Sequence, residues 1–265
     1  MIELRAKLWR GVGLAAVLAG GVSIAGCQPR GQAGDDETQV AVDEAAAPQA
    51  APAVAAGGEG GEAGASTVYA ALDPAATKAL RLQHLKGFFL VAQKELQAGR
   101  AAEAGALVGQ GVLEVHSPAP EAFGALDVAP LSAVSDSLMD ARPEGARALQ
   151  AAIDTLAQEQ GPADAELIRR MLKITSGLYA GAVANGVVDP IEYQHSLGAA
   201  LAAQDAFTRA EAALTSTNPR RAAEVKTELQ RLVALWPSSA APLAPTPPAQ
   251  VAAQTSRVEL ALYGL

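Results

Sequence analysis

The chain lacks most of the residue types on which catalysis and metal binding depend. It contains one cysteine and three histidines among 265 residues, and aromatic residues make up only 4% of it. A single cysteine excludes an intramolecular disulfide, and a histidine metal site would need two or three histidines to converge with carboxylates. Because alanine is abundant while β-branched and aromatic residues are sparse, the composition predicts an all-α protein.

Motifs of enzymes and nucleotide-binding proteins are also missing. There is no Gly-x-Ser-x-Gly elbow, no Gly-x-x-x-x-Gly-Lys loop and no dinucleotide fingerprint. The 28 acidic residues outnumber the 20 basic ones, and the net charge of −8 opposes binding to a phosphate backbone. We therefore expect that the chain is not an enzyme and does not bind nucleic acid.

The N-terminus carries the one strong motif of the sequence. Three basic residues stand in the first ten, and residues 11–24 form an apolar run of 14 residues. Such a run is short for a permanent membrane span, which needs about 20 apolar residues, but it has the length of a signal-peptide core. It ends in Ile24-Ala25-Gly26-Cys27. This arrangement resembles the signal peptide and lipobox of a bacterial lipoprotein.

The resemblance implies that residues 1–26 are removed and that acyl chains such as palmitate are attached to Cys27. The covalent lipid would be the chain's only bound group, and membrane lipid its first partner. Gln28 in place of aspartate favours the outer membrane, with the protein facing the periplasm. An ordinary secretory signal with an unrelated cysteine, or an uncleaved N-terminal anchor, remains the alternative.

Composition divides the rest of the chain. Residues 27–66 hold the lipidated cysteine and a linker of Ala, Gly, Pro, Gln and acidic residues, which we expect to be disordered. Residues 67–236 should form one α-helical domain. Residues 237–250 are rich in Pro and Ala. The spacing of apolar residues predicts a short amphipathic helix over 251–265, docking on the domain or awaiting a partner, with a strand over 257–263 as the alternative.

Helical periodicity and capping residues predict a bundle or array of about seven helices in the domain. Asp73-Pro74, Asp189-Pro190 and Asn218-Pro219 are typical helix starts, and Pro143 and Pro162 are interpreted in the same way. Gly177 and Gly181 suggest a close helix contact, and no repeat at a fixed period is found. The expected helices are one that starts at Pro74 and ends before Gly99-Arg100, one over 101–115, one or two within 121–140 interrupted at Pro130, one over 146–160, one that contains Leu167 to Leu178 and ends near Asn185-Gly186, one that starts at Pro190 and contains Tyr193 to Leu214, and one that starts at Pro219 and ends at Trp236 before Pro237.

A second resemblance lies in residues 85–123. Residues 85–99, then His116-Ser117-Pro118 and Glu121-Ala122-Phe123, resemble a helical family of exported proteobacterial proteins associated with imelysin-type iron-uptake proteins. The resemblance implies that Glu95, His116 and Glu121 are candidate metal ligands. Phe88 stands where the family has its first histidine, and the His-x-x-Glu hallmark is absent at all three histidines.

Three functions follow from these observations. The first is a non-enzymatic binding or scaffolding module in the cell envelope, with another envelope protein as its partner. The second is an accessory protein of metal (iron) uptake with a carboxylate–histidine site. The third is an unrecognised hydrolase.

Overall fold

The computed structural model describes residues 65, 67–70, 72–184 and 187–265. All of them belong to the compact unit of residues 55–265. The signal segment, Cys27 and nearly all of the acidic linker lie outside the described residues, so their predictions stay predictions.

The described chain is almost entirely helical, which confirms the all-α prediction. Two short helical turns of other types lie between α-helices. Two strands of two residues each form one antiparallel pair, in which Val183 lies opposite Val188. The elements are α2 (Pro74–Gln97), α3 (Ala101–Gly111), a π-helical turn η1 (Val112–His116), a 3-10 turn η2 (Pro120–Phe123), α4 (Ala129–Met139), α5 (Gly145–Gln160), α6 (Ala165–Ala182), β1 (Val183–Ala184), β2 (Val187–Val188), α7 (Pro190–Thr217), α8 (Pro219–Val233) and α9 (Pro248–Ala261).

The three predicted caps begin helices as expected. The side chains of Asp73, Asp189 and Asn218 each accept hydrogen bonds from backbone N–H groups in the first turn of α2, α7 and α8. The other prolines behave differently. Pro130 lies in the first turn of α4 instead of interrupting a helix. Pro162 lies before α6 and does not begin it. The N-cap of α6 is Asp164, whose carboxylate accepts a hydrogen bond from the N–H of Leu167 at 2.8 Å.

Two other predicted segments are also refined. α6 ends at Ala182, before Asn185-Gly186, and the strand pair follows it. The C-terminal segment is the helix α9, so the strand alternative is wrong. α9 packs against α6 and α8 and buries Val251 and Val258. Of the two predicted roles for this helix, docking on the domain is therefore the one that the structure shows.

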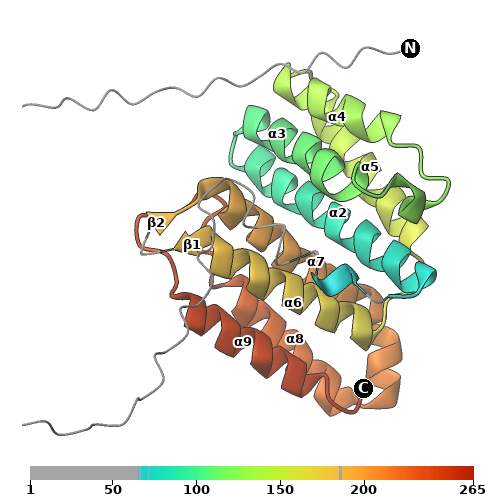
Figure 1. Cartoon of the computed structure of the whole chain (residues 1–265), viewed down its shortest axis with the longest axis vertical. Coiled ribbons are helices and arrows are strands. Elements are labelled where there is room, and N and C mark those ends of the chain that lie inside the picture. The colour runs from blue at the N-terminus through green and yellow to red at the C-terminus, as the bar shows by residue number, and fades with distance from the viewer. Residues whose placement is uncertain (1–64, 66, 71, 185–186) are drawn as a thin grey trace, which may run out of the picture. The chain divides into compact units, whose positions relative to one another are not determined.

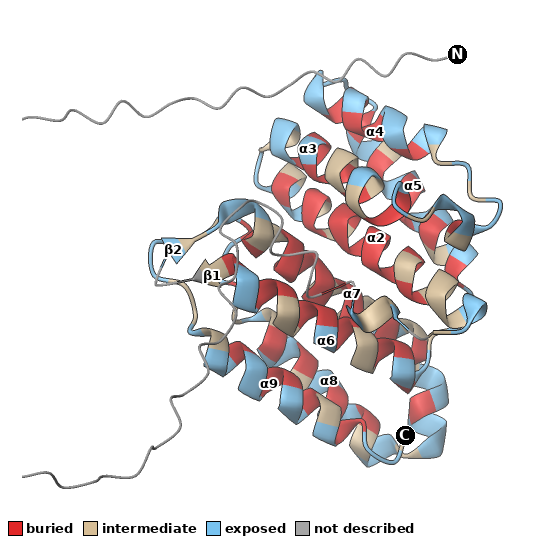
Figure 2. Ribbon diagram, viewed as in Figure 1, coloured by how far each residue is buried: buried red, intermediate tan, exposed pale blue. Residues whose placement is uncertain are grey.

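The helices form two four-helix bundles (Figure 1). In the first bundle, α2 packs on α3, α3 on α4, α4 on α5, and α5 returns to α2. In the second, α6 packs on α7, α7 on α8, α8 on α9, and α9 returns to α6. Contacts of α2 with α7 and α6 join the two bundles. Figure 2 shows buried residues along the inner faces of the helices and on both central helices, α2 and α7.

Helices α2 and α7 approach each other closely at Gly87 and Gly198. A Cβ atom added to Gly87 would lie 2.7 Å from the carbonyl oxygen of Gly198, and one added to Gly198 would lie 2.9 Å from that of Gly87. No side chain fits between backbones at that separation, so both positions need glycine. The close contact expected at Gly177 and Gly181 is not found there, because Gly181 is exposed.

Candidate functional site

The two central helices carry the same sequence motif. Residues 83–93 of α2 and 194–204 of α7, 111 positions apart, both read Gln-His-x-x-Gly-x-x-Leu-x-Ala-Gln. This single pair of copies does not form a repeat at a fixed period. A comparison of the two histidine-containing helices, rather than a search for a regular period, is the signal that would have found it. The glycines of the motif are the two that meet where α2 and α7 cross.

The first glutamine of each copy reaches a carboxylate on the opposite helix. The side-chain amide of Gln83 donates to Asp205 at 3.1 Å and to the carbonyl of Ala202 at 2.6 Å. The amide of Gln194 donates to Glu95 at 2.9 Å. Each carboxylate also pairs with an arginine: Asp205 with Arg209, one turn further along α7, and Glu95 with Arg100, which caps the start of α3. The two halves of the crossing are thus held by near-equivalent polar clusters.

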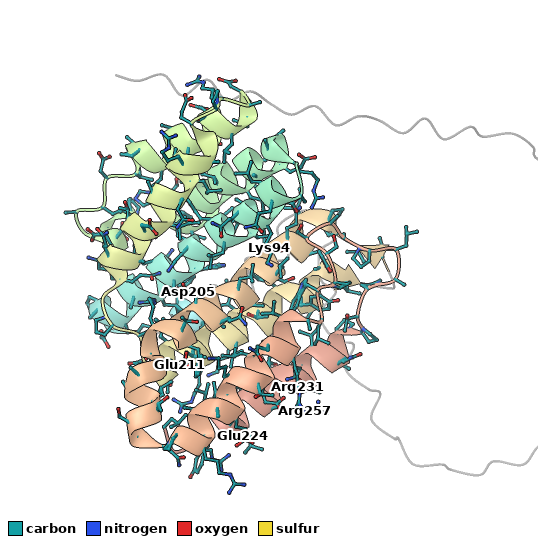
Figure 3. All side chains as sticks on the ribbon, turned by 180° about the vertical axis from the view of Figure 1, so that it is seen from behind. Lys94, Asp205, Glu211, Glu224, Arg231 and Arg257 are labelled. Carbon is teal, nitrogen blue, oxygen red and sulfur yellow. The ribbon has the colours of Figure 1, made fainter. Side chains whose placement is uncertain are left out.

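This arrangement gives Glu95 a structural role. Its side chain is fully buried and bonded to Arg100 and Gln194, so it does not face a site open to a ligand. Asp205 has an additional partner, because the buried Lys86 donates to both of its oxygens at 2.8 Å. Asp205 and Glu211 mark α7 in the view from behind (Figure 3), and Glu211 pairs with Lys226 of α8 at 2.9 Å.

The repeated histidines, His84 and His195, line one cavity of about 160 Å³. In Figure 1 the blue-green turn of residues 67–70 lies between the ribbons of α2 and α6. Tyr69, in this segment, lines the cavity. The aromatic ring of Phe88 lies between the two imidazoles, with its centroid 5.6 Å from that of His84 and 4.7 Å from that of His195. The full lining is Ala65, Tyr69, Arg81, His84, Phe88, Glu114, Val115, Pro118, Leu178 and His195.

Burial keeps both histidines neutral. Loss of hydration, aided by the nearby His195 and Arg81, lowers the pKa of His84 to about 3. Loss of hydration also lowers the pKa of His195 to about 4, although Asp189 acts in the opposite direction. His84 Nδ1 lies 2.6 Å from the Tyr69 hydroxyl. His195 Nδ1 lies 3.4 Å from a carboxylate oxygen of Glu114, and its Nε2 lies 3.3 Å from the side-chain oxygen of Gln110.

A π-helical turn, η1, forms part of the wall of the cavity. The N–H of Ser117 donates to the carbonyl of Val112, five residues earlier, at 2.9 Å. The carbonyl of Val115 in this turn accepts a hydrogen bond from Arg81 at 2.9 Å. The same guanidinium lies 4.3 Å from the centroid of the Tyr69 ring, a cation–π contact. The turn thereby brings Glu114 and Val115 to the cavity.

The sequence-based candidates His116 and Glu121 lie outside this cavity. His116 packs against Phe123, with ring centroids 4.8 Å apart, and burial lowers its pKa. Glu121 is exposed on the 3-10 turn. Among the residues that the structure describes, no three of the types His, Cys, Asp and Glu are grouped so that they could hold a metal ion. Glu95, His116 and Glu121 are accordingly not brought together.

The fold and the cavity define a helical protein of two joined four-helix bundles with a small cavity beside the junction. A family model described as the iron permease-associated 4-helix bundle domain matches residues 157–264. The match covers 108 of 265 residues, and it spans the second bundle, α6 to α9. No curated protein and no solved structure matches the chain. No helix within the described residues is long and apolar enough to cross a membrane.

Proposed function

We propose that the chain is a non-enzymatic accessory protein of bacterial iron uptake that acts beside an iron permease in the cell envelope. The similarity of residues 157–264 to the iron permease-associated 4-helix bundle domain carries this proposal. The bounds of the match support it, because they coincide with a closed bundle and not with an arbitrary stretch of helix. The resemblance of residues 85–123 to imelysin-type proteins points to the same process from the other bundle.

In this proposal the protein is a lipoprotein held at the membrane by acyl chains on Cys27. The acidic linker of residues 28–66 would hold the helical unit away from the lipid surface. A flexible chain of 39 residues spans on the order of 30–40 Å r.m.s., which would leave the bundles free to meet a permease. The envelope partner expected from the sequence thus becomes the permease, which joins the scaffolding and uptake hypotheses.

The proposal is tested by deleting the gene in the bacterium that carries it and measuring growth and ⁵⁵Fe accumulation with and without an iron chelator in the medium. We expect slower growth and reduced iron accumulation only when iron is scarce, and recovery with the full chain. Equal iron accumulation by the deletion strain and its parent under chelation would contradict a role in uptake. Crosslinking of the full chain in membranes should also recover an iron permease, and its repeated absence among the products would argue against the partner.

The anchor has its own test. Cys27→Ser should release the protein from the membrane fraction and remove incorporation of labelled palmitate. Gln28→Ser, one residue further on, is the matched control and should leave both unchanged. Membrane retention of Cys27→Ser would rule out the lipid as the anchor.

A further inference from the structure

Two buried polar atoms of α2 have no hydrogen-bond partner among the described residues. They are Nε of Arg81 and Nε2 of His84, which lie three positions apart on one face of the helix and belong to residues that line the cavity. His84 is only 5% exposed. Buried polar groups in folded proteins are nearly always hydrogen-bonded, because an unpaired one costs about as much as a lost hydrogen bond. The two atoms therefore indicate that the cavity receives a ligand.

Both atoms are hydrogen-bond donors. The guanidinium Nε can only donate. His84 is neutral and has one ring N–H, and its Nδ1 lies 2.6 Å from the Tyr69 hydroxyl. We assign the hydroxyl as the donor in that contact because a phenol is a far stronger acid than a neutral imidazole. The ring proton of His84 is then on Nε2, and the group that completes both residues is an oxygen acceptor. Beside a guanidinium, a carboxylate is the acceptor that binds most strongly.

Much of the remaining lining is apolar. Ala65, Phe88, Val115, Pro118 and Leu178 contribute to the walls of the cavity. Walls of this kind are typical of sites for small organic molecules, in which a few polar groups fix the orientation of an apolar body. The described side chains offer no group that could hold a metal ion. The lining therefore fits an organic molecule that has a carboxylate and an apolar body.

The charges of the lining limit how many carboxylates the ligand can have. The Arg81 guanidinium would attract an anion, whereas the carboxylate of Glu114, which lies 3.4 Å from Nδ1 of His195, would repel one. Burial lowers the pKa of both His84 and His195, so neither imidazole adds a positive charge. Arg81 balances one carboxylate, but a second would meet the repulsion of Glu114 without a cation of its own. A monocarboxylate is therefore favoured over a polyanion.

We propose that the cavity binds a small monocarboxylate with an apolar or aromatic body. The carboxylate accepts hydrogen bonds from Arg81 Nε and His84 Nε2, and the body contacts the apolar lining. In the structure Tyr69 covers these residues, because its ring centroid lies 4.3 Å from the Arg81 guanidinium carbon and its hydroxyl contacts His84. The ligand therefore enters as the turn of residues 67–70 moves aside. This inference does not depend on the proposed role in iron uptake.

The test is calorimetry of the full chain in detergent with benzoate, butyrate, benzamide and citrate. We expect one benzoate or butyrate to bind per chain. Benzamide has the shape of benzoate without its charge, and citrate carries additional carboxylates, so both should bind at least about tenfold more weakly. Equal affinities for benzamide and benzoate would contradict recognition of the charge by Arg81. Tightest binding of citrate would overturn the preference for a monocarboxylate, and no binding of any probe would refute the site.

Two substitutions in the cavity should change the affinity for benzoate in opposite directions. Arg81→Gln removes the cation and should weaken binding by about tenfold or more. Glu114→Gln removes the repelling carboxylate and should strengthen binding by about threefold. Arg170→Gln and Glu121→Gln are the matched controls, because they remove the same charges at residues that do not line the cavity. Both controls should leave the affinity unchanged.

Misfolding cannot produce this pattern. Circular dichroism and the thermal midpoint report whether Arg81→Gln folds, and a damaged fold would weaken binding in Glu114→Gln rather than strengthen it. If Glu114→Gln weakens benzoate binding at an unchanged thermal midpoint, Glu114 holds the ligand instead of repelling it, and an anionic ligand is wrong. If the two controls shift the affinity as much as the cavity variants do, binding follows the net charge of the chain and the cavity is not the site.

Discussion

His84 and His195 are buried and neutral, and this makes the stability of the fold depend on pH. The pKa values of about 3 and about 4 lie below the ordinary value of 6.5. Below pH 6.5 both histidines bind a proton in the unfolded chain but stay neutral in the folded chain. The free energy of unfolding should therefore be highest above pH 6.5 and should decrease as the pH is lowered toward 4 and then 3. At pH 5 we expect each histidine to have lowered it by about 2 kcal/mol.

Urea denaturation at pH 7 and pH 5 measures this loss. The double variant His84→Gln/His195→Gln should show a smaller loss than the native sequence, since glutamine does not titrate. Both proteins share the same carboxylates, so the difference between their pH profiles isolates the histidines. Parallel profiles would show that the histidines are not responsible.

Replacing the carboxylates of Asp205 and Glu95 by amides should lower the free energy of unfolding by different amounts. Asp205→Asn leaves the ammonium of Lys86, whose side chain is 3% exposed, without a charge partner. Glu95→Gln leaves Arg100, whose side chain is 33% exposed and can hydrate. Because an uncompensated buried charge is far more costly, we expect a loss of about 3 kcal/mol for Asp205→Asn and about 1 kcal/mol for Glu95→Gln. Equal losses in chemical denaturation would contradict this account.

At the scale of helices, the crossing of α2 and α7 depends on the absence of side chains at two positions. A Cβ at Gly87 or Gly198 would meet the backbone of the other helix at under 3 Å. Backbone cannot rotate away as a side chain can, so Gly87→Ala and Gly198→Ala should each cost about 2 kcal/mol or more, despite the better helix propensity of alanine. The double variant should cost less than the sum, because one substitution already separates the helices.

Gly109→Ala is the matched control for these variants. Gly109 also lies within an α-helix, but the nearest atom to an added Cβ is the Ser135 hydroxyl oxygen at 3.1 Å, which belongs to a side chain. Its effect on the thermal midpoint should be small. A loss as large as that of Gly87→Ala would show that the glycine effect is general to the helices and not specific to the crossing.

Elements whose signals are local were predictable from the sequence, and elements that depend on distant contacts were not. The caps at Asp73, Asp189 and Asn218 act on the next three residues, so the starts of α2, α7 and α8 were readable. The π-helical turn that contains Glu114 has no local signal of this kind. The Val115 carbonyl in this turn accepts a hydrogen bond from Arg81, which is 34 residues away in the sequence. Only the pairing of α2 with α7 places His84 and His195 at one cavity.

At the scale of the whole molecule, the two bundles depend on each other through α2 and α7. The second bundle, which the family model matches, presents to α2 a face of α7 that includes Gly198 and Ala202. It also supplies Asp205 to Lys86 and Gln83 of the other bundle. The second bundle expressed alone would expose this face to water. Asp205 and Gln194 would also lose the residues of α2 with which they form hydrogen bonds.

We therefore expect residues 157–265, expressed alone, to unfold at a markedly lower urea concentration than residues 55–265, or without a sharp transition. The larger fragment should unfold in one cooperative step, because its core runs through the α2–α7 contact. Circular dichroism and tryptophan fluorescence monitor both fragments, since Trp236 is buried beside Tyr179 with ring centroids 5.1 Å apart. If the smaller fragment unfolds as cooperatively and at the same urea concentration, the second bundle is an independent domain, and the crossing at Gly87 and Gly198 only attaches the first bundle to it.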